Sequence, residues 1–168
     1  MSLHHDLLNQ AELLARREPR KPKQASLRRA VSTAYYGLFH LLTHEASERM
    51  IRGFGRERLQ YAFRRSFAHR MMKDACIEIP KPNSKLAPLW GASAMPPNLK
   101  VIADVFIELQ QARHEADYDL SRAFTRVEVN VLVDRARLAF SSWPPVKNSV
   151  EGDVFLIALL VNNGLYRS

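Results

Sequence analysis

The stretch Arg113–Leu120 (RHEADYDL) contains six side chains that can carry a charge or exchange a proton. It directly follows an apolar run, Val101–Leu109, with helical character. If that helix continues, Arg113 and Asp117 are four residues apart and can form a charge-assisted pair near its end. Polar side chains this dense at a helix end can form a working site. The same pair can instead be a structural lock, and the residues alone leave both interpretations open.

The Arg113 side chain needs a partner, because it falls four residues after Leu109, on or beside the stripe expected to face the core. An unpaired guanidinium costs several kcal/mol when it is buried. Asp117 and Tyr118 are the local candidates. The more distant candidate is a polar stripe on an earlier helix, which either projects into a cleft or is a solvated boundary face. That stripe consists of Arg29, Ser32, Tyr36 and His40.

A second candidate centre is the cationic segment Arg64–Arg70. On one continuous helix, Arg65 and His69 share a face, with Arg64 and Arg70 beside them. A histidine that titrates near neutrality beside fixed cations suits phosphodiester cleavage. The alternative is a patch that only contacts phosphates.

The elements that position these residues are predicted to be helices, because apolar residues recur at helical spacing and no segment alternates as a strand does. Thr125-Arg-Val-Glu128 is a capping-box signature. Five prolines between residues 79 and 98 predict a long loop, in which Trp90 is expected to be exposed. We expect helices over residues 3–14, 24–48, 56–76, 99–116 and 125–143, and a short one over 150–161. The predicted fold is all-α, an antiparallel four- to five-helix bundle in a single domain over residues 1–168, with a core over about 3–143 and an appendage over 144–168.

The charge is unevenly distributed along the chain, which has a net charge of +8. Residues 16–73 hold fifteen Lys and Arg against four Asp and Glu, while the rest is near neutral. Such a basic half fits a polyanion-facing surface, most simply for nucleic acid, although a solvated helical face is equally compatible.

Other features limit the class of protein. The single Cys76 cannot form an internal disulfide, and His40 and His44 have zinc-ligand spacing without a third ligand, so we predict neither a metal nor a cofactor. The longest apolar run, 154–161, is far shorter than the roughly 20 residues of a membrane helix. A start without a signal-peptide pattern adds the expectation of a cytoplasmic protein without membrane contact.

Two segments together resemble the HEPN superfamily (higher eukaryotes and prokaryotes nucleotide-binding). Ser26–His40 (SLRRAVSTAYYGLFH) is similar to its "RRAxxxAYYAxFH" helix, and Arg113–Tyr118 (RHEADY) is similar to the "RxxADY" element of one branch. The resemblance covers about residues 3–143. It implies a helical bundle that is commonly a homodimer. Many members are metal-independent ribonucleases, often toxins paired with a nucleotidyltransferase antitoxin.

The resemblance also implies a site and shows a departure from it. In the nucleases of the family, an arginine and a histidine four to six residues later meet across the dimer. Arg113 occupies the arginine position here, but Tyr118 stands five residues later, and His114 is adjacent to Arg113 instead. General acid–base cleavage by the usual pair therefore lacks its histidine.

Two hypotheses follow from these patterns. The first is an HEPN-like protein that binds RNA or nucleotide through its basic half, and that acts as a metal-independent endoribonuclease if its degenerate Arg-x4-Tyr site is active. The second is a non-catalytic interaction module that dimerises or binds a nucleotidyltransferase-like antitoxin. The candidate catalytic residues are Arg113, Asp117, Tyr118 and His69. The candidate binding residues are Arg29, Tyr36, His40, Arg64, Arg65 and Arg70.

Overall fold

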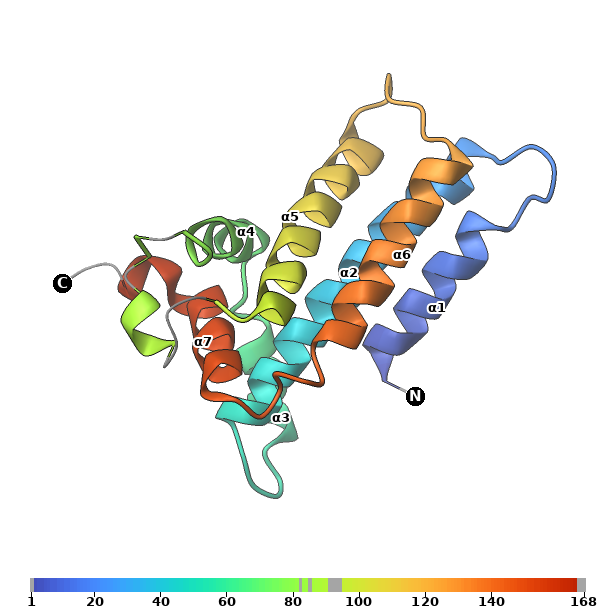
Figure 1. Cartoon of the computed structure of the whole chain (residues 1–168). Coiled ribbons are helices and arrows are strands. Elements are labelled where there is room, and N and C mark those ends of the chain that lie inside the picture. The colour runs from blue at the N-terminus through green and yellow to red at the C-terminus, as the bar shows by residue number, and fades with distance from the viewer. Residues whose placement is uncertain (1, 82, 85, 91–94, 166–168) are drawn as a thin grey trace. The chain divides into compact units, whose positions relative to one another are not determined.

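The chain is all-helical in the computed structural model, which describes residues 2–81, 83–84, 86–90 and 95–165 (Figure 1). Within these residues there are seven α-helices and one 3-10 turn, and no strand. None of the described helices combines the length and hydrophobicity needed to span a bilayer. The helices are α1 (Leu3–Ala15), α2 (Gln24–Met50), α3 (Glu57–Arg64), α4 (His69–Glu78), α5 (Pro97–Tyr118), α6 (Arg126–Ser142) and α7 (Val150–Leu165), and the 3-10 turn is η1 (Ala87–Leu89).

The chain forms two compact units, each built from two separate stretches of sequence. Unit 1 comprises Met1–Leu41 and Val105–Ser141, and unit 2 comprises Leu42–Asp104 and Ser142–Ser168. Helices α2 and α5 therefore each contribute residues to both units. The prediction of a single domain stays a prediction.

Unit 1 consists of α1, the first two thirds of α2, the second half of α5, and α6. Each helix is linked to the next around the unit. Ser32 of α2 donates to Asp117 of α5 at 2.5 Å, and Arg135 of α6 donates to Glu108 of α5 at 2.9 Å. Arg137 of α6 forms an ion pair with Glu12 of α1, which closes the ring of four helices. The core inside this ring contains Leu8, Leu14, Leu27, Val31, Leu38, Phe106, Leu109, Val129 and Val133.

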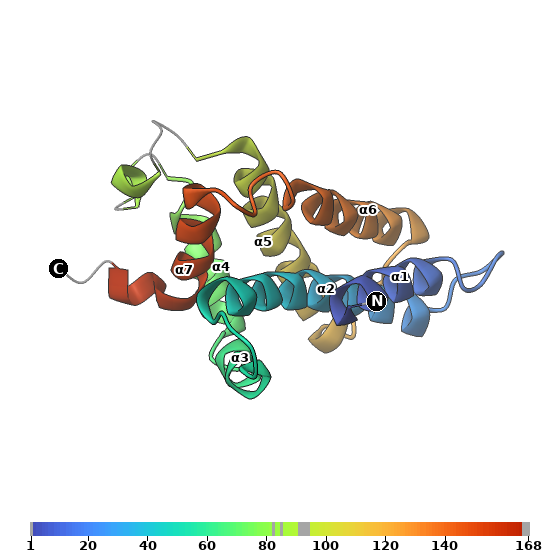
Figure 2. The same cartoon turned by 90° about the horizontal axis from the view of Figure 1, so that it is seen from below.

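Close approach between α1 and α2 explains the glycine in the middle of α2. A Cβ atom at Gly37 would lie 3.5 Å from the carbonyl oxygen of His4 and 3.5 Å from the amide nitrogen of Leu8. These are ordinary contact distances, so alanine would fit but a longer side chain would meet the α1 backbone. In Figures 1 and 2, α1 and the start of α2 lie side by side. The α1 backbone therefore passes close to Gly37.

Unit 2 is built around the end of α2, the start of α5, and α3, α4 and α7. Helices α4 and α7 pack together, and their buried residues include Met72, Cys76, Phe155 and Leu159. Gly152 is required near the start of α7, because a Cβ atom there would lie 2.3 Å from the carbonyl oxygen of Val146. α7 extends beyond the expected end at residue 161, across non-helical backbone at Val161.

The prediction of one helix over residues 56–76 was wrong. The chain forms α3 and α4 instead, and Ala68 between them has extended backbone angles (φ −107°, ψ 129°). A straight helix would place Leu59, Phe63 and Phe67 in one stripe, but Leu59 remains 54% exposed while Phe67 is buried. The break buries Phe67 and Met72 without burying α3, none of whose residues is buried.

The expectation of an exposed Trp90 was also wrong. Trp90 is only 2% exposed, and Leu86 before η1 is equally buried. Between 79 and 96, the described residues form turns and η1, as the prolines predict, although residues 82, 85 and 91–94 lie outside the described part, and α5 begins at Pro97. The indole is large and apolar, so burying it stabilises the segment.

The capping box at the start of α6 is confirmed. The Thr125 amide donates to Glu128 Oε2 at 2.8 Å, and the Glu128 amide donates to Thr125 Oγ1 at 3.2 Å. Hydrogen bonds from Arg122 and from Thr125 lower the pKa of Glu128 from 4.5 to about 2.

The lowered pKa predicts a pH dependence of stability. The Glu128 carboxylate stabilises the folded state above its unfolded pKa of 4.5, and this stabilisation is lost as the pH falls toward about 2. The difference in melting temperature between wild type and Glu128→Gln should therefore be largest above pH 5 and should shrink steadily between pH 4.5 and 2. Thermal melts by circular dichroism at several pH values measure it. A difference that does not change with pH would contradict the assignment.

Candidate functional site

The Arg113 guanidinium is held among three tyrosine rings. Its central carbon lies 5.5 Å from the Tyr35 ring centroid, 5.7 Å from that of Tyr36 and 5.9 Å from that of Tyr118. Stacking of this kind contributes about 0.5–2 kcal/mol for each ring, more as water is excluded. Only 15% of the Arg113 side chain is exposed. The sequence places these residues on two helices, and packing of α2 against α5 within unit 1 brings them together.

The partners expected for Arg113 are confirmed. Its Nε lies 3.3 Å from Asp117 Oδ2, and its Nη2 donates to the Tyr36 hydroxyl at 3.3 Å. Burial alone would lower the pKa of Arg113, but the Tyr36 hydroxyl and the Asp117 charge together raise it, so the group stays cationic. The Nε is nevertheless buried without a well-aligned hydrogen bond to any described residue.

A groove beside Arg113 gathers several of the predicted site residues. Its volume is about 530 Å³, and all its lining belongs to unit 1. Arg29, Tyr36, Asp117 and Tyr118 lie in this lining, whereas His40 does not. The His40 ring instead lies next to that of Tyr36, with centroids 6.4 Å apart. The remaining lining residues are Ala25, Arg28, Ser32 and Ala116.

The cations in this groove differ in how they are engaged. Arg29 is exposed, and its side chain forms no hydrogen bond or ion pair with any described residue. Arg113 is held by Tyr36 and Asp117, and Asp117 also accepts a hydrogen bond from Ser32. The groove lining therefore offers the unengaged Arg29 guanidinium, the Arg28 guanidinium that is held by backbone carbonyls, and the ring of Tyr118, which is 66% exposed. Arg113 contacts the rings of Tyr36 and Tyr118 but is not itself part of the lining.

Sequence reasoning missed Arg28, a residue of α2 whose side chain caps the carboxyl end of α5. Its Nη1 donates to the Ala116 carbonyl at 2.9 Å, and its Nη2 donates to the Asp119 carbonyl at 2.9 Å and to that of Arg122. The last carbonyls of a helix have no partner inside the helix, and a cation there also favours the helix dipole. The requirement for such a donor was readable from the helix end, but its source on another helix was not.

His114 lies on the solvent side of α5, as the helical geometry predicts. Its ring centroid is 5.1 Å from that of Tyr118, whose other neighbour is the Arg113 guanidinium. Tyr118 therefore contacts both an imidazole and a guanidinium.

The second candidate centre, Arg64–Arg70, does not have the predicted geometry. Arg64 ends α3, Arg65 lies in the following turn and His69 begins α4, so Arg65 and His69 do not share a helix face. Arg64 is engaged by Ser47 Oγ at 2.7 Å and by Glu48 at 3.2 Å, and Arg70 lies 3.9 Å from Asp74. All these residues belong to unit 2. The break between α3 and α4 is the physical reason for the difference.

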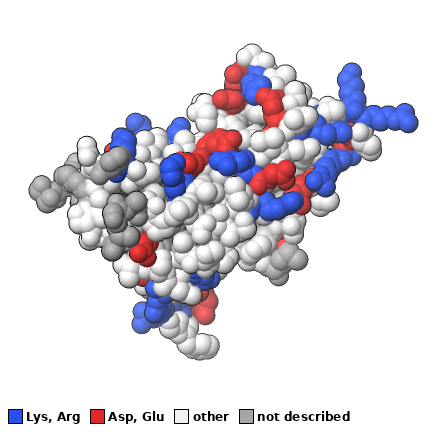
Figure 3. All heavy atoms as spheres, viewed as in Figure 1, with Lys and Arg blue, Asp and Glu red and all other residues white. Residues whose placement is uncertain are grey.

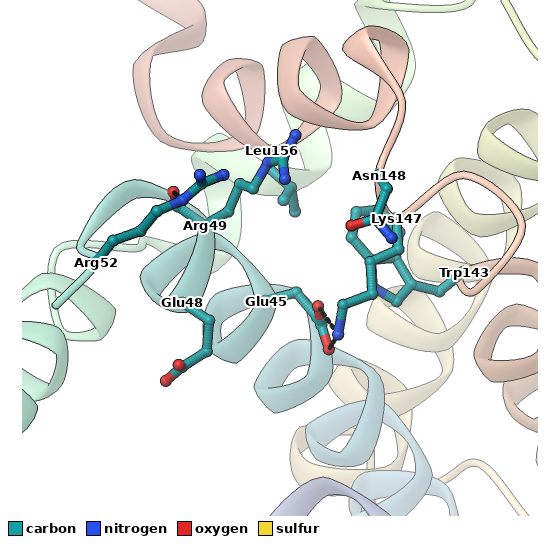
Figure 4. A pocket seen from close by; sticks show the side chains of 8 residues that line it. All are labelled: Glu45, Glu48, Arg49, Arg52, Trp143, Lys147, Asn148 and Leu156. Atoms are coloured by element: carbon teal, nitrogen blue, oxygen red, sulfur yellow. Dashed lines mark hydrogen bonds and ion pairs between the residues drawn. The ribbon is translucent and has the colours of Figure 1, made fainter. Parts of the chain in front are cut away.

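Unit 2 also contains a pocket of about 290 Å³, beside the end of α2 and the residues that follow α6 (Figure 4). Most of its charges are already paired. Lys147 lies 2.8 Å from Glu45, and Arg49 donates to both carboxylate oxygens of Asp153, at 2.5 and 2.8 Å. Because these charges are paired with one another, they stabilise the fold and are not available to a ligand. The groove of unit 1 is therefore the stronger candidate site.

The surface charge is mixed on the face shown in Figure 3. Lys and Arg side chains there alternate with Asp and Glu instead of forming one continuous basic patch. This matches the ion pairs of unit 1, such as Arg122 with Glu128 and Arg135 with Glu108. Net charge alone therefore does not locate the binding surface.

Comparisons with known proteins give this chain no family. No protein-family model, no curated protein and no solved structure matches it. The class that the structure defines is an all-helical protein with a tyrosine-lined arginine groove in one of its two units.

The role of Arg28 predicts a difference between adjacent arginines. Arg28→Ala removes the donors of the α5 carboxyl end and should lower the free energy of unfolding by about 2 kcal/mol. Arg29→Ala, next to it but without a partner among the described residues, should change it by no more than about 0.5 kcal/mol. Urea denaturation of the two variants measures the difference, and equal losses would refute the capping role.

Proposed function

We propose that this chain is an HEPN-like protein that binds RNA or nucleotide in the groove of unit 1. The observation that carries the proposal is the combination in one groove of the unengaged Arg29 and the exposed Tyr118 ring, with the Arg113 guanidinium held against that ring from outside the lining. Guanidinium groups bind phosphates through several hydrogen bonds, and an exposed ring can stack on a base. The two sequence segments that resemble the family, Ser26–His40 and Arg113–Tyr118, supply the two sides of this groove.

The same proposal includes association as a homodimer and, if the groove cleaves RNA, metal-independent catalysis. Arg113 would then stabilise the charge on the phosphoryl group, because it stays cationic in a partly dehydrated place. Tyr118, His40 or His69 would have to move the protons. Tyr118 is the candidate within the groove, where related nucleases have histidine.

Binding is tested by fluorescence anisotropy with labelled RNA and with a labelled nucleotide at low salt and without metal. Arg29→Ala should weaken binding about 5- to 10-fold, because one phosphate contact is worth about 1 kcal/mol. Arg58→Ala is the matched control, since Arg58 is also an exposed arginine but lies on α3. Wild-type protein that binds neither ligand at low salt would refute the proposed function.

Catalysis is tested separately with the same RNA and a chelator. If the groove is a nuclease site, Arg113→Ala should lower the cleavage rate by a factor on the order of 10². His69→Ala tests the second candidate centre, in unit 2, by itself. If the protein binds RNA but shows no cleavage that depends on Arg113 or His69, the binding proposal stands and the proposed ribonuclease activity is refuted.

A second candidate function, a non-catalytic interaction module, is favoured by a different groove between α5 and α6. Its volume is about 430 Å³, and two of its valines, Val127 and Val131, are 73% and 51% exposed. Apolar surface of this kind suits another protein chain, either a second copy or a nucleotidyltransferase-like antitoxin. In this case Arg113 is a structural lock, and Arg113→Ala lowers the melting temperature without changing any activity.

The interaction module predicts that charge in the apolar groove blocks association. A Val127→Lys/Val131→Lys protein should be monomeric at concentrations where the wild type dimerises, because burying two ammonium groups is unfavourable. Light scattering after size-exclusion chromatography measures the mass. Leu138→Lys is the control, since Leu138 is 44% exposed on the same helix but does not line the groove. A dimer that persists in the double variant would exclude this groove as the interface.

A further inference from the structure

The connection between α1 and α2, residues Arg16–Lys23, concentrates positive charge more than any other eight-residue stretch of unit 1. We call it the basic loop. Its cations are Arg16, Arg17, Arg20, Lys21 and Lys23. All five are exposed, and no side chain among them forms a hydrogen bond or ion pair with a described residue. In this respect the basic loop differs from the stretch over residues 122–137, where Arg122, Arg135 and Arg137 are all paired with carboxylates.

The one acidic residue of the basic loop is used to shape it. Glu18 Oε1 accepts a hydrogen bond from Ser26 Oγ at 2.8 Å, and Glu18 Oε2 accepts one from the Lys23 amide at 3.3 Å. The hydrogen bond from Ser26 lowers the pKa of Glu18, so it remains a carboxylate. With five cations and one carboxylate, the loop keeps a net charge of +4.

The basic loop is also fixed from outside. Arg126, at the start of α6, donates to the Pro19 carbonyl at 2.9 Å and to that of Glu18. Beyond the loop, Gln24 exchanges two hydrogen bonds with the Phe124 backbone, at 2.7 and 2.9 Å. Because these contacts hold the backbone, ordering the loop on a partner costs less entropy than ordering a free chain.

The basic loop leads directly into one wall of the groove. Ala25, two residues after Lys23, and Arg29 both line that groove. Six residues of helix separate Lys23 from Arg29, a distance of about 9 Å along the axis. A fully stacked nucleic-acid strand advances about 3.4 Å for each nucleotide and an extended strand advances further, so this distance corresponds to at most about three nucleotides. Cations of the loop and groove can therefore contact successive phosphates of one strand.

We infer that the basic loop binds the phosphodiester backbone of a single-stranded polynucleotide whose neighbouring nucleotide lies in the groove. This inference rests on the proposed function and narrows its ligand from a nucleotide in general to a polynucleotide. The groove supplies Arg29 and the Tyr118 ring for one nucleotide, and the loop supplies the sequence-independent part of the affinity. RNA and DNA share this backbone chemistry.

The experiment compares a mononucleotide with 20-nucleotide RNA and DNA on wild type, a loop variant and a charge-matched control. The loop variant changes Arg16, Arg17, Arg20, Lys21 and Lys23 to Gln. The control changes Arg52, Arg56, Arg58, Lys81 and Lys100, all exposed and all in unit 2, to Gln. Circular dichroism checks that each protein is folded, and binding is measured between about 50 and 200 mM salt.

The loop variant should bind the RNA oligonucleotide at least tenfold more weakly at low salt and keep its affinity for the mononucleotide. Its plot of log affinity against log salt should be shallower by about 2–3, since each phosphate contact with a single strand contributes about 0.7 to the slope. The control should lose much less. If the loop variant binds both RNA and DNA more weakly, the loop recognises the backbone that the two share. If only RNA binding is weakened, the loop is specific for RNA.

Two results would overturn the inference while leaving the groove proposal standing. In one, the loop variant keeps the full advantage of the oligonucleotide over the mononucleotide. In the other, the control weakens oligonucleotide binding as much as the loop variant does, so that only total charge matters. Wild-type protein that binds no ligand at low salt would instead refute the proposed function itself.

Discussion

The carboxyl end of α5 is the constraint on which the organisation of unit 1 depends. The last carbonyls of a helix have no partner inside the helix, and a cationic side chain that donates to them also interacts favourably with the helix dipole. Arg28 of α2 supplies that donor to the carbonyls of Ala116, Asp119 and Arg122. It thereby fixes the register of α2 against α5, and the other contacts between these helices follow from this register.

The first consequence of this register is the position of Arg113. With α5 held against α2, the Arg113 guanidinium lies among Tyr35, Tyr36 and Tyr118, and Ser32 reaches Asp117. These contacts lock the structure, yet they also hold a cation at the edge of a groove with its charge secured. Structural lock and binding site are therefore compatible descriptions of the same residues. Arg29 distinguishes the two roles, because its side chain is exposed in the groove and contacts no described residue that the fold depends on. A substitution there therefore tests binding alone.

Much of the fold was predictable because local rules agree with the packing. The helices α1, α2, α5 and α6 follow the apolar periodicity to within a few residues, and Thr125 with Glu128 forms the expected cap. The predictions failed for α3, α4 and Trp90. No proline or glycine marks the break at Ala68, and a tryptophan among prolines gives no local sign of burial. In both places the outcome depends on which apolar surface is available to cover Phe67 or Trp90, and periodicity carries no information about that.

The sequence by itself determined the helical class, most of the helix limits and the pairing of Arg113 with Asp117, since all of these depend on neighbours within a few residues. It also gave the polar stripe that contains Tyr36 as a distant candidate partner for Arg113, beside Asp117 and Tyr118, without choosing among them. Only the tertiary structure decided that Arg28 caps α5, that Arg65 and His69 lie on different elements, and that Glu18 and Arg126 hold the basic loop. These contacts join residues up to about a hundred positions apart, and their existence depends on helix packing, which no local pattern records.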